Sequence, residues 1–496
     1  MAGLIRATVF AVKEEATEGV YAPPSAGSDF IPLRPGNTLN FEPELLESDE
    51  LLNDIGASKS SIGKEAVSGS HSAYLKHSGV EGQAPEASIF YESLFGSKVV
   101  NALGTTSTSG STVSLLEIND LGTYVQGQAV LIKDAANGYS IRNVSEVTGG
   151  GDLVLNFNLP SVPTIGTELG LSVLYSPVAQ GHPSFSTSKY LGNGHAIEVA
   201  AGNQSSEMSI TADANGFGEV EFSYSGTKYY FNPVTITSSN KWIDITDDNG
   251  TIAVSIPEKI YKSAIELSSA LEAAINAASL DSFTVVYSNV TGKFTITGSL
   301  FLSLLWSSGV HAASSIGQTI GFDISADDTG SLTYTSDNAQ LLTAAYTPSY
   351  DSAENIIIKG AQLFIGGQSD NICICAQSVS ITVSKELEDE DCICEDTGVS
   401  SKIPTSRSVE MGVTATLNKY DAALLDALIQ NKSVSAMFNA GPKAGGNFIP
   451  GKCFNFYMQT ATVSAYTTTG DSFIQAEFTL KGYVTTSTKD GYLNFV

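Results

Sequence analysis

The chain has 496 residues, of which 42% are hydrophobic and only 16% are charged, so it can bury a large core. Its 52 acidic and 25 basic residues give a net charge of −27, which argues against a surface that binds nucleic acid by neutralising phosphates. Arg6 interrupts the N-terminal apolar run, and no run reaches the roughly 18 residues of a spanning helix, so we expect no signal peptide, no membrane segment and synthesis in a cytosol.

Short alternating runs, punctuated by Gly, Asn and Asp, predict a mainly β chain. Two early strands are expected at 38–41 (TLNF) and 63–75 (GKEAVSGSHSAYL), with the acidic segment 44–60 between them. The strand at 63–75 is unusual, because its small polar residues give it little to pack with. A helix is expected over 85–97, where Gly96 supplies a stop.

The following residues predict two insertions on either side of a pair of closing strands. Residues 98–181 contain about five short strands with Gly turns, enough for a small β-barrel module. Residues 182–231 then complete the first unit with a hairpin ending in EVEFSYSG, at 219–226. A second insertion at 232–345 is expected to be α+β, with an amphipathic helix over 263–279.

The second half of the chain repeats the same order of elements. Residues 380–391 match 38–49, and residues 405–417 match 63–75, at one constant offset of 342 positions. The order continues with an acidic segment, a helix and a closing strand at 386–402, 419–433 and 475–482. Matched pairs are Leu39 with Ile381, Phe41 with Val383, Val67 with Val409 and Phe222 with Phe478. We therefore predict two tandem β-sandwich domains, the first at 1–97 and 182–231 and the second at 346–496.

The sequence carries no motif of a catalytic, cofactor-binding or metal-binding site, so we expect no enzyme and no cofactor. No metal-ligand spacing joins the five histidines, which are His71, His77, His182, His195 and His311. We expect the first two of these at the surface. Two Asp clusters fit ordinary turns better than a calcium loop.

Two C-x-C pairs leave three interpretations open. Cys373 and Cys375 interrupt an apolar strand, whereas Cys392 and Cys394 lie in the acidic segment EDEDCICEDTG. Four thiolates can hold zinc tetrahedrally, the pairs can form disulfides, or the thiols can simply pack as small hydrophobes. Neighbouring carboxylates raise thiol pKa values and disfavour thiolates, so packing is favoured; Cys453 is single.

Several N-terminal motifs resemble those of the major tail tube proteins of long-tailed, non-contractile bacteriophages. They are the E-x-T-x-G opening, the I-P-L strand, an acidic segment, a G-K strand and an S-G-V-E-G loop, at 15–19, 31–33, 46–51, 63–69 and 78–82. Residues 304–330 are similar to a module of other phage virion proteins, and the segment from Gly451 resembles the closing strands of a tube domain.

The resemblance implies a structural virion protein without an active site. Its β-sandwich domains, each with a flanking helix, would assemble into a ring-wide β-barrel, and stacked rings would form a tail tube through which the genome passes into the host. Alternative interpretations are a surface-exposed β-rich adhesin or another virion decoration protein; a carbohydrate-active virion enzyme is least favoured. Implied partners are the tape measure, terminator and tail tip proteins, with DNA passing unbound and no membrane contact. The location implied is the virion tail, assembled in the host cytoplasm.

The repeat and the charge sharpen that expectation. Family rings are commonly hexameric, so two tube domains in one chain predict a homotrimer with approximate sixfold symmetry. An acidic channel wall is expected, with candidates Glu65, Glu219, Glu221, Glu410 and Glu477. We expect both inserted modules on the outside of the tube, and both acidic segments to contact the next ring.

Overall fold

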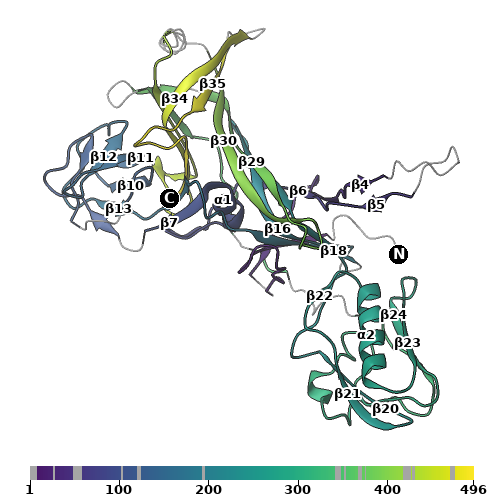
Figure 1. The fold of residues 1–496 in the computed structure, drawn as a ribbon. Helices are drawn as coiled ribbons and strands as arrows, with labels where there is room; N and C mark the ends of the chain where they lie inside the picture. The colour runs from purple at the N-terminus through teal and green to yellow at the C-terminus, as the bar shows by residue number, and fades with distance from the viewer. Residues whose placement is uncertain are drawn as a thin grey trace, which may run out of the picture.

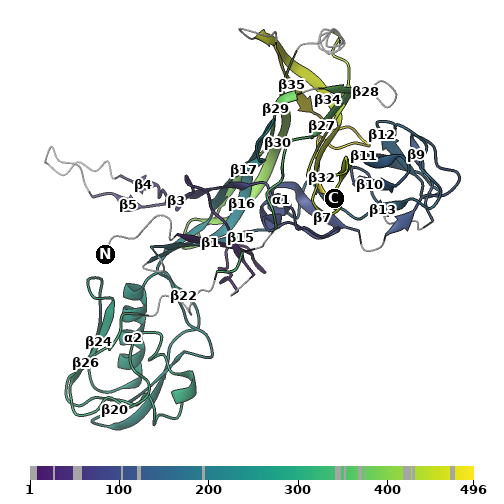
Figure 2. The same cartoon turned by 180° about the vertical axis from the view of Figure 1, so that it is seen from behind.

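The computed structural model describes residues 8–25, 28–47, 59–101, 104–119, 124–192, 196–340, 348–350, 353–366, 371–374, 376–416, 426, 430–469 and 475–496. It is mainly β, as the sequence predicts. Long strands run side by side through the middle of the molecule, and two smaller modules lie at separate places on it (Figures 1 and 2).

Eight antiparallel strands form one continuous sheet, which we call the inner sheet. Their order is β3 (Thr38–Phe41), β6 (Val67–Tyr74), β17 (Glu219–Gly226), β16 (Ala196–Asp213), β29 (Ala376–Asp391), β30 (Val399–Thr416), β35 (Gln475–Gly482) and β34 (Phe454–Thr469). The first four strands belong to the N-terminal repeat (repeat 1) and the last four to the C-terminal repeat (repeat 2). The two repeats therefore share a single sheet.

Strand register confirms the sequence repeat. Thr38 lies opposite Ser70 in repeat 1, and Ser380 lies opposite Gly412 in repeat 2, so both partners are shifted by the same 342 positions. The closing strands match in the same way. Glu219 lies opposite Tyr74, and their equivalents Gln475 and Thr416 lie opposite each other.

A β-bulge also recurs at the same place in each repeat. The pairing of β16 with β17 shifts between Ser205 and Glu207, and the pairing of β34 with β35 shifts between Val463 and Ala465. The skipped residue is a serine in both cases, Ser206 or Ser464. A bulge bends a strand, and in repeat 1 the pairing of β16 with β29 begins directly after it, at Glu207.

An outer layer of strands packs over one face of the inner sheet. In repeat 1 it is built from β1 (Val9–Glu14), β2 (Phe30–Ile31), β15 (Phe185–Leu191), the first part of β16 and β18 (Lys228–Phe231). In repeat 2 it is built from β27 (Gln362–Gly366), β28 (Asn371–Ile374), β31 (Val434–Ala440), the first part of β34, β36 (Tyr492–Phe495), β14 (Val173–Pro177) and β7 (Gly96–Val100). One hydrophobic core runs between the layers and spans both repeats.

The first insertion forms a separate six-stranded sheet with its own core. Its strands are β8 (Thr105–Thr106), β9 (Leu115–Leu116), β10 (Ala129–Asp134), β11 (Gly138–Val147), β12 (Leu153–Asn156) and β13 (Glu168–Gly170). Buried amides tie this module to repeat 2, because Asn143 hydrogen-bonds Asn455 at 2.9 Å and Asn455 contacts Asn494 at 3.0 Å. The module is thus anchored to the core rather than tethered by a loop.

The second insertion combines a helix with several small sheets around another core. Its elements are β19 (Val234–Thr235), β20 (Trp242–Asp247), β21 (Gly250–Ser255), β22 (Ile260–Tyr261), α2 (Ala264–Ala278), β23 (Phe283–Ser288), β24 (Lys293–Gly298), β25 (Ser303–Leu304), a 3₁₀ turn (Ala312–Ser314) and β26 (Thr333–Thr335). The α2 helix is the amphipathic helix that the sequence predicts. The Ser263 hydroxyl caps it by accepting from the Glu266 amide, and the Glu266 carboxylate accepts from the Lys262 amide.

The helix expected near Pro85 is also present, as α1 (Ser88–Phe95). It ends at Gly96, whose φ of 88° lies in the left-handed region that favours glycine. The matching helix expected at 419–433 falls largely on 417–425 and 427–429, which lie outside the described residues.

Two local expectations are wrong. His71 and His77 are each only 1% exposed, because His71 stacks between the rings of Phe10 and Phe90 in the core. The acidic segment 386–402 is not a long loop, since most of it continues β29 and β30 as a paired hairpin.

That hairpin extension lies on repeat 1 of the same chain rather than projecting alone. Lys385 Nζ donates to the Ser93 carbonyl of α1 at 2.7 Å, and Gln204 Nε2 donates to the Lys402 carbonyl at 2.9 Å. In repeat 1 the corresponding segment is an arm formed by β4 (Leu45–Leu46) and β5 (Ser61–Ile62), and residues 48–58 lie outside the described residues.

The E-x-T-x-G motif has a structural explanation in this fold. The buried Glu15 carboxylate accepts hydrogen bonds from the Gly19 and Gly202 amides and from the Ser184 and Ser186 hydroxyls, at 2.6–2.9 Å. Gly19 has a φ of 73°. The motif therefore fixes the turn after β1 against β15 and β16.

Candidate functional site

One face of the inner sheet is polar along its whole width. Residues directly opposite each other in antiparallel strands point to the same face, so the register connects Ser72, Glu221, Ser209, Thr382 and Glu410 in one row across five strands. The alternate residues point into the core between the layers. Serine, threonine, glycine and glutamate thus make up most of the polar face.

Acidic residues are prominent on this face. Four of the five predicted glutamates lie there: Glu219, Glu221, Glu410 and Glu477. Arg34 forms an ion pair with Glu219 at 2.7 Å, and Lys481 forms one with Glu410 at 3.4 Å. The register adds Glu207 and Asp213, which sequence reasoning missed although they alternate with the buried Met208, Ile210 and Ala212.

Glu65 is the exception among the predicted glutamates. It precedes β6 and has the parity of the buried residues Val67 and His71. Its carboxylate pairs with Lys262 Nζ of the second insertion at 3.1 Å. Glu65 therefore connects a module to the body and does not lie on the polar face.

The side chains of the strand at 63–75 are small for two reasons. Ser68, Ser70 and Ser72 belong to the polar face, where no core is available. On the other face, a Cβ at Gly69 would clash with the ring of Tyr224, which lies directly over it. Glycine at this position lets the buried tyrosine pack against the backbone of β6.

The inner sheet has two edges at which no further strand is paired among the described residues. One is β3, which pairs with β6; the other is the end of β34, which pairs with β35. Between the repeats, by contrast, β16 and β29 pair over seven residues, from Glu207 with Ser384 to Asp213 with Ser378. The internal joint therefore uses β16 and β29, the equivalents of β34 and β3.

Buried ionisable groups cluster behind this joint. Lys385 is 3% exposed, and burial, reinforced by the positive charge of Arg407, lowers the pKa of Lys385 to about 7. Burial likewise lowers the pKa of His182, whose Nδ1 lies 3.4 Å from Lys385 Nζ. Arg407 itself binds both carboxylate oxygens of Asp490 at 2.9 Å. The Lys385 hydrogen bond to the Ser93 carbonyl holds the hairpin extension on repeat 1, whereas Arg407 joins β30 to Asp490 within repeat 2.

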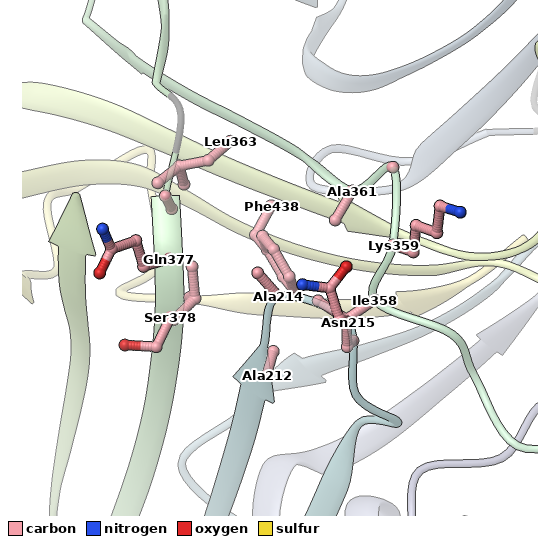
Figure 3. Close-up of a pocket in the computed structure, with 13 residues that line it drawn as sticks. Ala212, Ala214, Asn215, Ile358, Lys359, Ala361, Leu363, Gln377, Ser378 and Phe438 are labelled. Atoms are coloured by element: carbon pink, nitrogen blue, oxygen red, sulfur yellow. The ribbon is translucent and has the colours of Figure 1, made fainter. Parts of the chain in front are cut away.

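A cavity of about 230 Å³ opens at the end of the joint (Figure 3). Its lining comes from the end of β16 and the following turn, from the segment before β27, and from β27, β29 and β31, and includes Ala212, Ile358, Leu363 and Phe438. Lys359 is the only charged side chain among the lining residues. The other lining side chains are apolar or carry an amide or a hydroxyl group.

Cys373 lies too far along the chain from Cys392 and Cys394 for these three described residues to bind one zinc ion within a chain. The sixteen residues of β29 separate them, which corresponds to roughly 50 Å along an extended strand. Cys392 and Cys394 are free thiols at the far end of the hairpin. Cys453 is buried, and burial raises the pKa of its thiol to about 12. The side chain of Cys373 and the whole of Cys375 lie outside the described residues.

Within the described part of the chain, no three His, Cys, Asp or Glu side chains group as metal ligands. The helices described there are also too short or too polar to cross a bilayer.

Comparisons with known proteins give one family. No curated protein matches the chain. Solved structures that match include a type six secretion system protein (14% identity, TM-score 0.17, 24% of this chain and 77% of that chain) and the virion of a native gene transfer agent particle (11%, 0.19, 27% and 95%). A mutant form of the Hcp1 protein from the E. coli EAEC 042 pathovar also matches (14%, 0.17, 26% and 95%). At such low identities and TM-scores we draw nothing further from these likenesses.

The family comparison covers more of the molecule. The model of the phage tail tube protein family matches residues 6–300, which include nearly all of repeat 1, the whole first insertion and the second insertion as far as residue 300. Because this match spans more than half of the sequence, the chain belongs to the phage tail tube protein family and is a structural protein of the virion tail.

Proposed function

We propose that three copies of this chain close into a ring, that rings stack into a tail tube, and that the polar face of the inner sheet lines a channel through which the phage genome passes without binding. The observation that carries this proposal is the pattern of sheet edges. Each chain contains two equivalent repeats and one joint between them, and its free edges, β3 and the end of β34, are the equivalents of the two edges already joined.

Repeating the internal joint between chains closes a ring, because a head-to-tail contact that closes by rotation forms a cyclic assembly. Three chains supply six repeats, so the ring has true threefold and approximate sixfold symmetry. Each chain supplies the eight strands of its inner sheet. At the usual spacing of neighbouring strands, three chains then give a barrel about 37 Å across between backbones, before strand tilt widens it. Closure also removes both exposed edges, which otherwise template aggregation.

The chemistry of the inner face supports passage of DNA. Outside the hairpin extension, six carboxylates and one lysine, Lys481, project from the described strands of this face, and Arg34 pairs with one of the carboxylates, Glu219. Like charges repel phosphates at short range, and the small hydroxyl side chains between them offer no basic anchor. A genome moving through such a channel meets a wall that does not retain it.

Both insertions leave the body from strands of the outer layer. The first lies between β7 and β14, and the second follows β18. This supports placing the modules, at about 98–181 and 232–345, on the outside of the tube. At the tube ends we propose contacts with the tape measure, terminator and tail tip proteins that the resemblance implies, after assembly in the host cytoplasm.

Electron cryo-microscopy of tubes grown from the purified chain tests the proposal. We expect three chains per ring, six similar densities around an open channel, and both modules at the outer radius. Six whole chains per ring, or a wall built from the outer-layer strands, would refute it.

A further inference from the structure

The register of the internal joint points to the residue pairs of the joint between chains. Resting on the ring proposed above, we infer that the end of β34 pairs antiparallel with β3 of the next copy, so that Tyr466 lies opposite Phe41 and Thr467 opposite Asn40. The partner is a second copy of this chain, and the interface is a strand edge on each side that pairs with no further strand in the part of the chain that the structure describes.

The internal joint is the template for this register. Met208 lies opposite Val383 and Ser209 opposite Thr382. The recurring bulge aligns β16 with β34. Because it lies at Ser206 in one strand and at Ser464 in the other, each β34 position is the equivalent β16 position plus 258. The hairpin register converts β29 positions into β3 positions by subtracting 342, as from Ser380 to Thr38.

Applied together to the register of the internal joint, these two offsets determine four residue pairs between chains. They are Tyr466 with Phe41, Thr467 with Asn40, Thr468 with Leu39 and Thr469 with Thr38. Both offsets come from backbone pairing and not from side-chain similarity, so the inference holds even though few residues are identical between the repeats.

The side chains exposed at the two edges suit this pairing. Phe41 is 37% exposed, stacks on Tyr229 with ring centroids 5.2 Å apart, and would gain Tyr466 as a neighbour across the joint. Thr467 and Asn40 both lie on the polar face. The joint therefore continues the core on one side and the polar wall on the other.

The arm that follows β3 gives a second, independent indication. Leu45 lies opposite Ile62 in the arm, and their equivalents Leu387 and Pro404 lie opposite each other in the hairpin extension of repeat 2, after the same register shift. Because that extension rests on repeat 1, its own chain covers Leu387 and leaves it half-buried. The arm instead projects away from the body (Figures 1 and 2).

The apolar side chains on the arm are exposed because no other part of the described chain covers them. Leu45, Leu46 and Ile62 are 58%, 53% and 63% exposed. A cluster of exposed apolar side chains on a projecting hairpin is typical of an interaction surface. If β3 pairs with β34 of the next copy, the arm is carried onto repeat 2 of that copy, as the hairpin extension is carried onto repeat 1.

Paired cysteines in the full-length chain test the register. T467C with N40C should form a disulfide between chains on oxidation of assembled tubes, giving covalent dimers and trimers in denaturing gels. Because directly opposite Cβ atoms are about 5 Å apart and diagonal ones about 7–8 Å, the off-register pairs T467C with T38C and T467C with E42C should remain monomeric. The equivalent internal pair, S209C with T382C, should form a disulfide within one chain and calibrates the yield. Each single-cysteine variant controls for the natural thiols Cys392 and Cys394.

The outcomes separate this inference from the ring itself. Rings of three chains in which an off-register pair cross-links better than T467C with N40C would overturn the register while the proposed function stands. Rings with six whole chains would overturn the proposed function. A ring map that resolves side chains gives a second readout, and Tyr466 away from the neighbouring Phe41 would also reject the inference.

Discussion

β3 and β29 occupy equivalent places in the two repeats, yet β3 has four residues and β29 has sixteen. Both pair with the next strand of their own repeat in the same register. Among the described residues only β29 has a second neighbour, because β16 of repeat 1 lies along its other edge. The length of a strand here follows the edges available to it more than its own residues, as expected when sheet propensity depends on context.

The largest single loss of stability should come from the core of repeat 1. Phe222 and Phe478 are equivalent, but Phe222 also lies within 5.1 Å of the Phe90 and Tyr91 rings of α1. Phe222→Ala should lower the free energy of unfolding by about 3–5 kcal/mol, and Phe478→Ala by about 1 kcal/mol less, because aromatic pairs add roughly that amount. Urea unfolding of both variants measures the difference, and equal losses would show that α1 adds nothing to repeat 1.

The second effect is a pH dependence that one repeat has and the other lacks. Lys385 has the equivalent Pro43 in repeat 1. The pKa of Lys385 is about 7 in the folded chain, because burial and Arg407 oppose the charge while Glu18 favours it, and about 10.4 when unfolded. Between these values unfolding takes up a proton, so raising the pH favours the folded state.

The free energy of unfolding should therefore rise from pH 7 towards pH 10, relative to Lys385→Met, by up to about 4 kcal/mol. Urea titrations of both proteins at several pH values give this difference, and Lys481→Met, at an exposed position, is the control. A constant difference across the window would mean that Lys385 keeps its ordinary pKa.

Sequence periodicity was sufficient for the repeat, for the mainly β fold and for α1 and α2. It also placed four of five glutamates on one face, because alternation follows directly from strand geometry. It failed for Glu65, which lies just outside β6 and is held by Lys262 from a distant module. It failed for His71, because nothing local indicates the rings of Phe10 and Phe90 that enclose it.

The acidic hairpin extension was missed for a related reason. Residues 386–402 are charged, and their sequence alone is typical of a loop. They form strands because the end of β29 pairs with the start of β30 and the hairpin rests on repeat 1. Non-local contacts of this kind have no signature in a short window. The resemblance implied that tube domains join into one barrel, but the sequence did not identify β16 and β29 as the strands of the joint, for the same reason.

A smaller effect should separate the arm from the hairpin extension. Leu387→Ser should lower the free energy of unfolding of the chain by about 1 kcal/mol, since the half-buried side chain loses part of its transfer free energy. Leu45→Ser should leave unfolding unchanged and raise the protein concentration needed for tubes to form. Chemical unfolding and light scattering measure the two effects, and an arm variant that assembles like the wild type would remove the arm from the interface.

The smallest effect on stability should come from the polar face. Glu221 and Glu477 are equivalent and exposed, so Glu221→Lys and Glu477→Lys should each change the free energy of unfolding by less than about 0.5 kcal/mol. Their effect on DNA binding should be larger, because lysine side chains arranged around the channel wall attract phosphates where glutamates repel them. Tubes of the double variant should retain duplex DNA at low salt and release it as salt rises, whereas Glu258→Lys, on the second insertion outside the inner sheet, should not. Fluorescence anisotropy with assembled tubes measures this retention.

If the polar face lines the channel in both repeats alike, the two single variants should bind DNA equally. Binding by the Glu258 variant instead would place the DNA-accessible surface on the outside.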